Sequence, residues 1–323
     1  MPNPLPEASW VLHDGKSGNR RQAFALAAAM QLDVREWSLS AGIGARWFSP
    51  RRFLRDRFAF GREFAGALID SPPALAIGCG RLAALATRMA RDAGAKAIQI
   101  LDPRIDTAYW DLVIAPEHDR LAGDNVLTLL GSLSPVDADW LGRARADFPE
   151  LGRLPAPRTA VLLGGPTAAT RFERSALEVL LSKLEYQLAR DGGSAMICGS
   201  RRSPPEWAAL MRDRYGHEPR HRVWMDAGDD VNPYPGVLGW ADRIIVSPDS
   251  VNMISEACAT TAPVFVAEPN RATGRVGAFL ESLLTRGRVR PQARDVHDFP
   301  VEALAETARV AALVRDQIGR AHV

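Results

Sequence analysis

Residues 243–268 read Arg-Ile-Ile-Val-Ser-Pro-Asp-Ser-Val-Asn-Met-Ile-Ser-Glu-Ala-Cys-Ala-Thr-Thr-Ala-Pro-Val-Phe-Val-Ala-Glu, and this stretch decides the fold. The β-branched run Ile244–Val246 predicts a strand that stops at the following proline, and Val264–Ala267 predicts a second strand. Between them Asp249 or Ser250 can cap a short helix, whose unpaired backbone N–H groups form an anion site. Strand, polar turn, helix and strand together are typical of half of a ligand-binding α/β unit.

The same alternation of short apolar runs and helical stretches extends along the chain. It begins with a strand at Ser9–Leu12 and a helix at Arg20–Met30, and it restarts with a strand at Thr159–Leu163 and a helix at 172–190. Such alternation indicates parallel sheets covered by helices. We therefore expect an α/β protein with two Rossmann-like lobes facing a cleft, which is the default ligand site.

The domain boundary is expected where prolines interrupt the alternation, in the segment 151–158. We place the first lobe at residues 1–152 and the second at 158–300. Residues 301–323 carry apolar side chains at helical spacing, which predicts an amphipathic helix that either crosses back to the first lobe or caps the second. A single large domain is the alternative for a chain of 323 residues.

Composition excludes several classes of protein. A net charge of +2 with 24% charged residues argues against nucleic-acid binding through a wide basic field. The three cysteines are scattered, so they indicate buried thiols rather than a zinc site or disulfides. The N-terminus lacks the pattern of a signal peptide, and no stretch is long and apolar enough to span a bilayer. We expect a cytoplasmic protein whose membrane contact is at most peripheral, at the inner membrane.

Small and polar residues follow the expected strands of the second lobe. Gly164 and Gly165 would let backbone N–H groups approach a phosphate, and Thr167 could add a hydroxyl. Ser200, Arg201 and Arg202 follow the next strand and suit a diphosphate. A tight turn without a ligand and a solvated arginine pair are the alternatives.

The last part of this predicted site lies around the helix of the opening stretch. Tyr234 stands in a rigid turn or a surface loop, and its ring could pack against the base of a nucleotide. Asp249, Ser250 and Met253 belong to the anion-binding helix start, and Glu256 could accept hydrogen bonds from a sugar hydroxyl. Because no carboxylates cluster in the sequence, we expect neither a metal ion nor a cofactor. A nucleotide sugar bound by these residues would be a substrate.

The first lobe has its own set of residues at predicted strand ends, where ligand groups collect in α/β folds. The candidate substrate-binding residues there are Gly15, Ser17, Gly18, Gly80, Arg81, Asp102 and Arg104. Candidate general bases are His13, Asp14 and His118, since each histidine stands beside an aspartate. Surface histidines without a role are the alternative.

Residues 46–62 interleave six arginines with five aromatic residues. Such a segment could lie on an anionic membrane or meet a partner, with its rings among the headgroups. Alternatively, the aromatic rings pack on the first lobe.

The motifs together resemble those of a known family. They are Asp14-Gly-Lys-Ser-Gly-Asn19, Gly78-Cys-Gly-Arg81, Gln99-Ile-Leu-Asp-Pro-Arg104, Asp111-Leu-Val-Ile-Ala-Pro-Glu-His-Asp119, Gly164-Gly-Pro166, Ser200-Arg-Arg202 and Asp249-Ser-Val-Asn-Met-Ile-Ser-Glu-Ala257. Over about residues 10–270 the chain resembles the bacterial branch of the mitochondrial-fission family named for the plant elongated-mitochondria factor. The resemblance implies a nucleoside-diphosphate-sugar epimerase or glycosyltransferase, or an adaptor like the plant member, which recruits a dynamin-related protein.

A second resemblance concerns residues 250–256 alone. They look like the donor-sugar signature of the bacterial N-acetylglucosaminyltransferase of peptidoglycan synthesis, which implies that Glu256 binds a ribose. The sequence after it, Ala-Cys-Ala-Thr-Thr, lacks the glycine-containing turn of that signature.

Our leading hypothesis is a metal-independent glycosyltransferase of the two-lobed GT-B type. Its partners would be a nucleotide sugar, bound mainly by the second lobe, and an unknown acceptor. A non-enzymatic adaptor and a nucleotide-sugar epimerase are the alternatives, and the sequence leaves the oligomeric state open.

Overall fold

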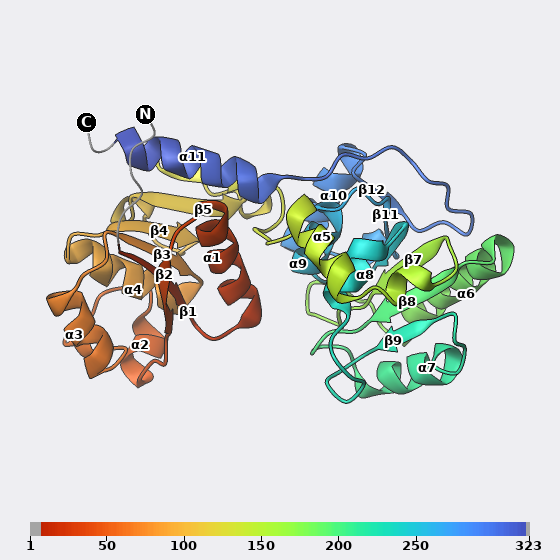
Figure 1. The fold of residues 1–323 in the computed structure, drawn as a ribbon. Helices are drawn as coiled ribbons and strands as arrows, with labels where there is room; N and C mark the ends of the chain where they lie inside the picture. The colour runs from red at the N-terminus through yellow and green to blue at the C-terminus, as the bar shows by residue number, and fades with distance from the viewer. Residues whose placement is uncertain (1–7, 321–323) are drawn as a thin grey trace. The chain divides into compact units, whose positions relative to one another are not determined.

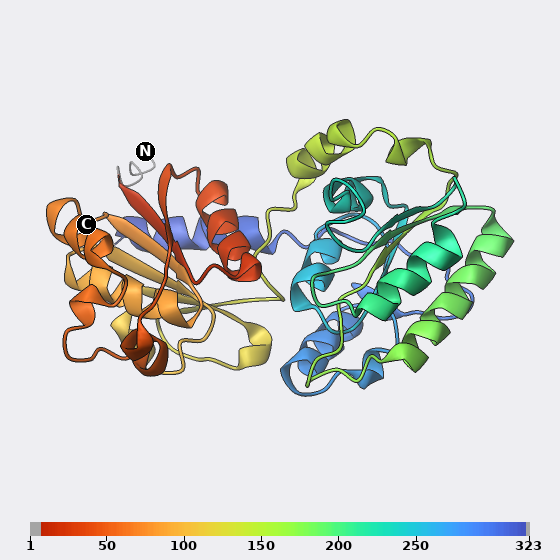
Figure 2. The same cartoon turned by 90° about the horizontal axis from the view of Figure 1, so that it is seen from below.

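The computed structural model describes residues 8–320, which form two units. Unit 1 comprises the described residues up to Pro135 together with those from Ala305 onward, and unit 2 comprises Val136–Leu304. Each unit is built on a six-stranded sheet whose strand pairs are all parallel and whose two faces are covered by helices (Figures 1 and 2). The α/β fold of two Rossmann-like lobes predicted from the alternating pattern is confirmed.

The sheet of unit 1 has the strand order β2-β1-β3-β4-β5-β6. Its strands are β1 (Ser9–His13), β2 (Val34–Ser38), β3 (Leu75–Cys79), β4 (Lys96–Ile100), β5 (Leu112–Pro116) and β6 (Val126–Leu129). Its α-helices are α1 (Ser17–Ala29), α2 (Ile43–Phe48), α3 (Arg62–Asp70), α4 (Arg81–Asp92) and α11 (Glu306–Arg320).

Alternate residues of β1 face opposite sides of this sheet and enter two separate cores. Val11 packs in the core that α1 and α11 cover, whereas Trp10 and Leu12 pack in the core that α4 covers. A strand buried on both faces reads as a continuous apolar run, which explains why sequence alone could find it.

The sheet of unit 2 has the order β12-β11-β10-β7-β8-β9. Its strands are β7 (Arg158–Leu162), β8 (Ser194–Cys198), β9 (Arg222–Trp224), β10 (Arg243–Val246), β11 (Val264–Val266) and β12 (Val289–Pro291). Its α-helices are α5 (Ala138–Asp147), α6 (Arg174–Asp191), α7 (Pro205–Tyr215), α8 (Tyr234–Trp240), α9 (Val251–Cys258) and α10 (Gly274–Thr285).

The edge strands β2 and β12 are absent from the sequence-based expectation. β2 reads Val-Arg-Glu-Trp-Ser and is half exposed, and β12 is only three residues long and contains a proline. Neither has the apolar run that reveals a central strand.

The division between the units falls after Pro135, earlier than the expected boundary at residue 152. The reason is that α5 packs on α8 of unit 2. Trp240 Nε1 donates to the carbonyl of Phe148 at 2.9 Å, and Arg145 Nη1 donates to the carbonyl of Gly239 at 3.2 Å. The proline segment 151–158 therefore lies inside unit 2.

The C-terminal helix α11 belongs to unit 1, where it packs on α1. Glu306 accepts a hydrogen bond from the Leu130 amide at 2.7 Å, and Thr307 Oγ1 donates to the Ser134 carbonyl at 2.9 Å. Val310 and Val314 are fully buried in the core beneath it. None of the helices in residues 8–320 combines the length and apolar character that crossing a membrane requires.

Candidate functional site

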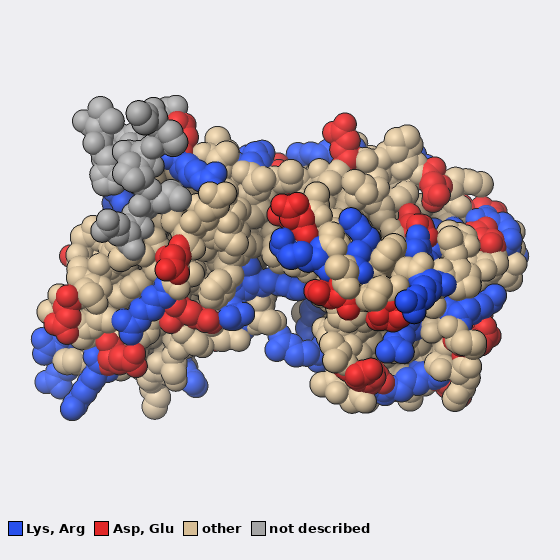
Figure 3. All heavy atoms as spheres, viewed as in Figure 1, with Lys and Arg blue, Asp and Glu red and all other residues tan. Residues whose placement is uncertain are grey.

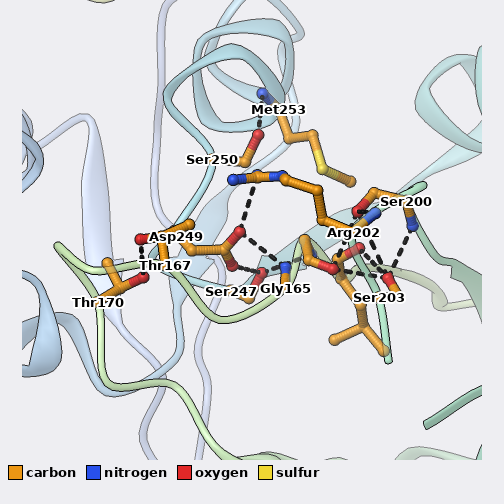
Figure 4. Close-up of polar contacts among 12 residues, drawn as sticks. Gly165, Thr167, Thr170, Ser200, Arg202, Ser203, Ser247, Asp249, Ser250 and Met253 are labelled. Carbon is orange, nitrogen blue, oxygen red and sulfur yellow. Dashed lines mark hydrogen bonds and ion pairs between the residues drawn. The ribbon is translucent and has the colours of Figure 1, made fainter. Parts of the chain in front are cut away.

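Three loops of unit 2 meet at the carboxyl edge of its sheet, because β8, β7 and β10 are neighbours and run parallel. They are residues 163–173 after β7, 199–204 after β8 and 247–250 after β10. Figure 4 shows their polar side chains converging around Asp249. Ligands of open α/β sheets bind at this edge.

Asp249 holds the three loops together. Its side chain is fully buried and accepts hydrogen bonds from Ser247 Oγ at 2.6 Å, the Gly165 amide at 2.8 Å and Arg202 Nη2 at 3.0 Å (Figure 4). A buried carboxylate with a donor from each of three loops fixes their mutual positions.

Gly164 and Gly165 are needed for close packing, which differs from their expected role. The amide of Gly164 donates to Ser247 Oγ at 2.8 Å, and that of Gly165 donates to Asp249, so neither amide is directed at a phosphate. A Cβ atom on Gly164 would lie 1.9 Å from Asp249 Oδ2, and one on Gly165 would lie 2.1 Å from the Arg202 carbonyl oxygen. The loops can approach this closely only without side chains.

The hydroxyl groups of these loops also bond within the site. Ser200 Oγ donates to the Gly164 carbonyl at 2.9 Å, and Ser203 Oγ donates to the same oxygen at 2.6 Å (Figure 4). Thr167 Oγ1 and Thr170 Oγ1 are 2.7 Å apart. Arg201 is exposed, and it is Arg202 that reaches Asp249.

The helix α9 is held at both ends. At its start, Ser250 Oγ accepts from the Met253 amide at 3.4 Å, as the capping pattern predicts. At its end, the buried guanidinium of Arg288 donates to the carbonyls of Cys258 at 2.9 Å and Thr260 at 2.8 Å. The position of α9 is therefore determined both by the loop before it and by Arg288, which lies immediately before β12.

Glu256 and Tyr234 form a pair that the sequence does not reveal. The Tyr234 hydroxyl donates to Glu256 Oε2 at 2.6 Å, and both residues are buried, with 7% and 2% of their surfaces exposed. Tyr234 is the first residue of α8 rather than part of a surface loop. The structure thus joins two residues predicted to contact a nucleoside separately.

The corresponding edge of unit 1 carries the histidine and aspartate that follow β1. His13 is buried, its Nδ1 accepts from the Gly15 amide at 3.1 Å, and its Nε2 donates to Glu36 at 2.8 Å. Glu36 also pairs with Arg20, which holds the pKa of this carboxyl at about 2. Because both ring nitrogens of His13 are engaged, the ring could accept a proton only by releasing the Gly15 amide.

Asp14 is committed to the structure of its own loop. It accepts from Asn19 Nδ2 at 2.9 Å and from the Lys16 amide at 3.2 Å. Burial raises the pKa of Asp14, but the hydrogen bonds from Lys16 and Asn19 outweigh burial and leave the pKa below its ordinary value. Asp14 is therefore a carboxylate near neutral pH, as a loop-ordering acceptor requires.

The remaining candidates of unit 1 occupy the same sheet edge. A Cβ on Gly80 would lie 2.4 Å from Asn19 Nδ2, which places the turn after β3 in contact with the first turn of α1. Arg81 donates to the Arg46 carbonyl at 2.7 Å. Asp102 pairs with Arg104 at 3.0 Å. Finally, Ser17 begins α1, Gly18 follows it, and His118 is half-buried in the turn 117–119 after β5.

Metal ligands do not cluster in the described residues: no group of three His, Cys, Asp or Glu side chains there could hold an ion. Cys79, Cys198 and Cys258 are free and fully buried, as predicted, and burial raises the pKa of each thiol. They are structural rather than reactive thiols.

Sequence reasoning missed two residues of the unit 2 site, Ser203 and Ser247, and it did not separate Arg202 from Arg201. Ser247 is the residue that directly follows β10, so its position at a strand end was a usable signal. Nothing in the sequence distinguishes Arg202 from Arg201, because the choice depends on which side chain faces Asp249.

Comparison with known proteins identifies relatives of the chain. The family model for mitochondrial fission ELM1 matches residues 17–318. Mitochondrial fission protein ELM1 of Arabidopsis thaliana is 30% identical over 246 residues, a match that covers 68% of this chain but only 57% of the plant protein. An uncharacterized protein of Rickettsia prowazekii is 23% identical, with 95% of this chain and 97% of that protein covered.

Solved structures share the fold at low sequence identity. UDP-GlcNAc 2-epimerase of Methanocaldococcus jannaschii is 10% identical with a TM-score of 0.54, over 95% of this chain and 99% of the epimerase. The Neisseria meningitidis UDP-GlcNAc 2-epimerase bound to UDP-GlcNAc is also 10% identical, with a TM-score of 0.52 over 97% and 99% of the two chains. These likenesses show a GT-B-like fold, and the family match, which spans most of the sequence, shows that the chain belongs to the mitochondrial fission ELM1 family.

Proposed function

We propose that the protein binds a nucleotide-diphosphate sugar at the carboxyl edge of the unit 2 sheet and transfers the sugar to an acceptor. The observation that carries the proposal is the locking of three ligand-facing loops by the buried Asp249. A site ordered before its ligand arrives loses less conformational freedom on binding. A protein of the same fold, the Neisseria epimerase, was solved with UDP-GlcNAc bound.

The diphosphate would lie at the start of α9. The first turn of a helix presents N–H groups without helical partners, and the helix dipole favours negative charge there. Arg201 and Arg202 follow β8 at the same sheet edge, and the Arg202 side chain is 47% exposed although it pairs with Asp249. In the proposal, the two arginines replace the amides of Gly164 and Gly165 as the phosphate contacts.

The nucleoside would meet the Tyr234–Glu256 pair. The Tyr234 hydroxyl orients one carboxylate oxygen of Glu256, and a carboxylate can accept further hydrogen bonds from ribose hydroxyls. Tyr234 belongs to α8 and Glu256 to α9, so the two helices together position this pair.

The acceptor would bind at the carboxyl edge of unit 1. His118 is the first candidate for the general base, because His13 is held between Gly15 and Glu36. The transfer is proposed to proceed without a divalent cation, so an excess of EDTA should leave the rate unchanged.

Calorimetry with UDP, GDP, ADP and CMP tests nucleotide binding directly. We expect one nucleoside diphosphate to bind the wild-type protein. Glu256→Gln should weaken that binding about tenfold, since it removes one charge-assisted hydrogen bond. Glu281→Gln, which alters an exposed carboxylate on α10 of the same unit, is the matched control and should bind like the wild type. Absence of binding by any of the four nucleotides at millimolar concentration would end the proposal.

Two other functions are favoured by specific relatives. The two structural neighbours described above are epimerases, which favours an epimerase. To test this, the protein is incubated with the nucleotide sugar that it binds, without an acceptor. A change in the configuration of the sugar would support the epimerase. The name of the Arabidopsis relative refers to mitochondrial fission, which favours an adaptor. Partner capture that is unchanged by Glu256→Ala, together with absent turnover, would support the adaptor instead.

A further inference from the structure

Residues 43–62 of unit 1 form a surface that joins exposed apolar side chains to arginines, and we call it the arginine-aromatic surface. Five of the ten large apolar side chains exposed in the described residues belong to it. These are Ile43 at 79%, Trp47 at 80%, Phe48 at 55%, Leu54 at 89% and Phe58 at 50% exposure. So high a local density of exposed apolar groups is unusual for a surface that only meets water.

The structure separates the side chains that hold this surface in place from those that face outward. Phe53 and Phe60 pack against the core beneath, so two of the five aromatic residues serve the fold. Trp47 follows Ile43 by one helical turn, so both lie on the same outward face of α2. Phe48 stacks on Phe53 with 5.5 Å between ring centroids.

The surface is attached firmly to α4, so its exposed groups are displayed on a fixed base. Arg88 Nη1 donates to the Pro50 carbonyl at 2.8 Å, and Arg81 Nη2 donates to the Arg46 carbonyl at 2.7 Å. Arg52 pairs with both Asp56 and Asp92.

The charge of the surface is almost entirely positive. It contains six arginines and one carboxylate, Asp56, which Arg52 already neutralises. Arg51, Arg55 and Arg62 are exposed, and among the described residues no carboxylate pairs with them. Lys and Arg side chains gather around the α2–α3 corner of unit 1 in the lower left of Figure 3.

We propose that the arginine-aromatic surface docks the protein on an anionic lipid bilayer. Trp47 and its apolar neighbours enter the headgroup region, while Arg51, Arg55 and Arg62 meet lipid phosphates. The combination of exposed rings and unpaired arginines fits an interface that is apolar below and negatively charged above. A protein partner of ordinary composition offers no such continuous negative layer.

Flotation with phosphatidylcholine vesicles, with and without phosphatidylglycerol, tests the proposal on the whole chain of 323 residues. We expect binding only to the anionic vesicles and its loss at high salt. The variant Arg51→Gln/Arg55→Gln/Arg62→Gln should bind roughly one hundredfold more weakly, since each arginine contributes about fivefold. Vesicles with brominated acyl chains should quench tryptophan fluorescence of the wild type more than that of Trp47→Ala/Leu54→Ala.

Matched variants separate this surface from general effects of charge and folding. Arg143→Gln/Arg153→Gln/Arg294→Gln removes the same charge from exposed positions of unit 2 and should float like the wild type. Val231→Ala removes an exposed apolar side chain of unit 2, 71% exposed, and should not alter the quenching. Thermal melting of all variants checks that they are folded.

Three results would overturn the proposal. The first is wild-type protein that stays at the bottom of the gradient in low salt, and the second is equal loss of binding by the two triple-arginine variants. The third is a dimer in sedimentation that Trp47→Ala/Leu54→Ala converts to a monomer while its vesicle binding stays intact, because a second copy of the chain then covers the surface.

Discussion

At the scale of single residues, the buried guanidinium of Arg288 has no carboxylate partner among the described residues. Its donors bond to carbonyl oxygens at the end of α9, and burial lowers the pKa of Arg288. The carbonyl end of a helix carries partial negative charge, so a cation there satisfies groups that would otherwise be unpaired.

Arg288→Met should therefore lower the free energy of unfolding by about 2–4 kcal/mol, because carbonyls at the end of α9 lose charged donors. Urea unfolding measures the change. Arg286→Met, at an exposed position two residues away, is the control and should differ from the wild type by less than about 0.5 kcal/mol. Equal losses in both variants would mean that the bonds to α9 are unimportant.

Glu36 makes the stability of unit 1 depend on pH in a predictable direction. Its pKa is lowered from 4.5 to about 2, chiefly by the hydrogen bond from Arg20. A carboxyl with a lowered pKa stabilises the fold above its ordinary pKa, and this contribution is lost as the pH falls through about 2.

The stability difference between wild type and Glu36→Gln should consequently shrink between about pH 5 and pH 2. Since the side chain is 38% exposed, solvent screening reduces the expected change to about 1 kcal/mol. Urea midpoints across this range measure it. Glu63→Gln, whose side chain is 81% exposed, is the control. A stability difference between the wild type and Glu36→Gln that is still undiminished at pH 2 would contradict this role of Glu36.

At the scale of elements, the loop after β7 requires glycine at position 165, whereas α5 does not require the glycine at position 142. Gly165→Ala places a Cβ 2.1 Å from a backbone oxygen, whereas Gly142→Ala in α5 has no neighbouring atom within 4 Å. The first variant should lose about 1–3 kcal/mol through overpacking, and the second should gain about 0.5–1 kcal/mol through helix propensity. Thermal melting of the pair decides, and a stabilised Gly165→Ala would show that the loops are not locked.

At the scale of the whole molecule, α11 completes unit 1 although it follows unit 2 in the sequence. Val314→Asp, at a fully buried position of α11, should expose the amides of β1 and β3 to hydrogen exchange while those of β7 and β8 stay protected. Ala312→Asp, two residues earlier on the exposed side, is the control. Equal loss of protection in both sheets would show that the units unfold together.

Several features could be predicted from residues close together in the sequence. The strands β1, β7 and β10 are buried on both faces of their sheets. Such a strand consists of consecutive apolar residues, so it can be recognised from its own sequence. The cap at Ser250 and the glycine and polar residues at strand ends can likewise be recognised from a few neighbouring residues. These signals predicted the two-sheet fold, which the structure confirms, and they predicted which loops could bear a site; ligand binding stays a prediction.

Other features depend on contacts between distant residues, which only the tertiary structure decided. Asp249 selects Arg202 over Arg201, Tyr234 pairs with Glu256, and Arg288 caps a helix 30 residues earlier. Likewise, α5 joins unit 2 and α11 joins unit 1 because of the surfaces they cover. The physical reason is that a strand or cap depends on neighbouring side chains, whereas a buried hydrogen bond or a helix contact depends on which segments the whole fold brings together.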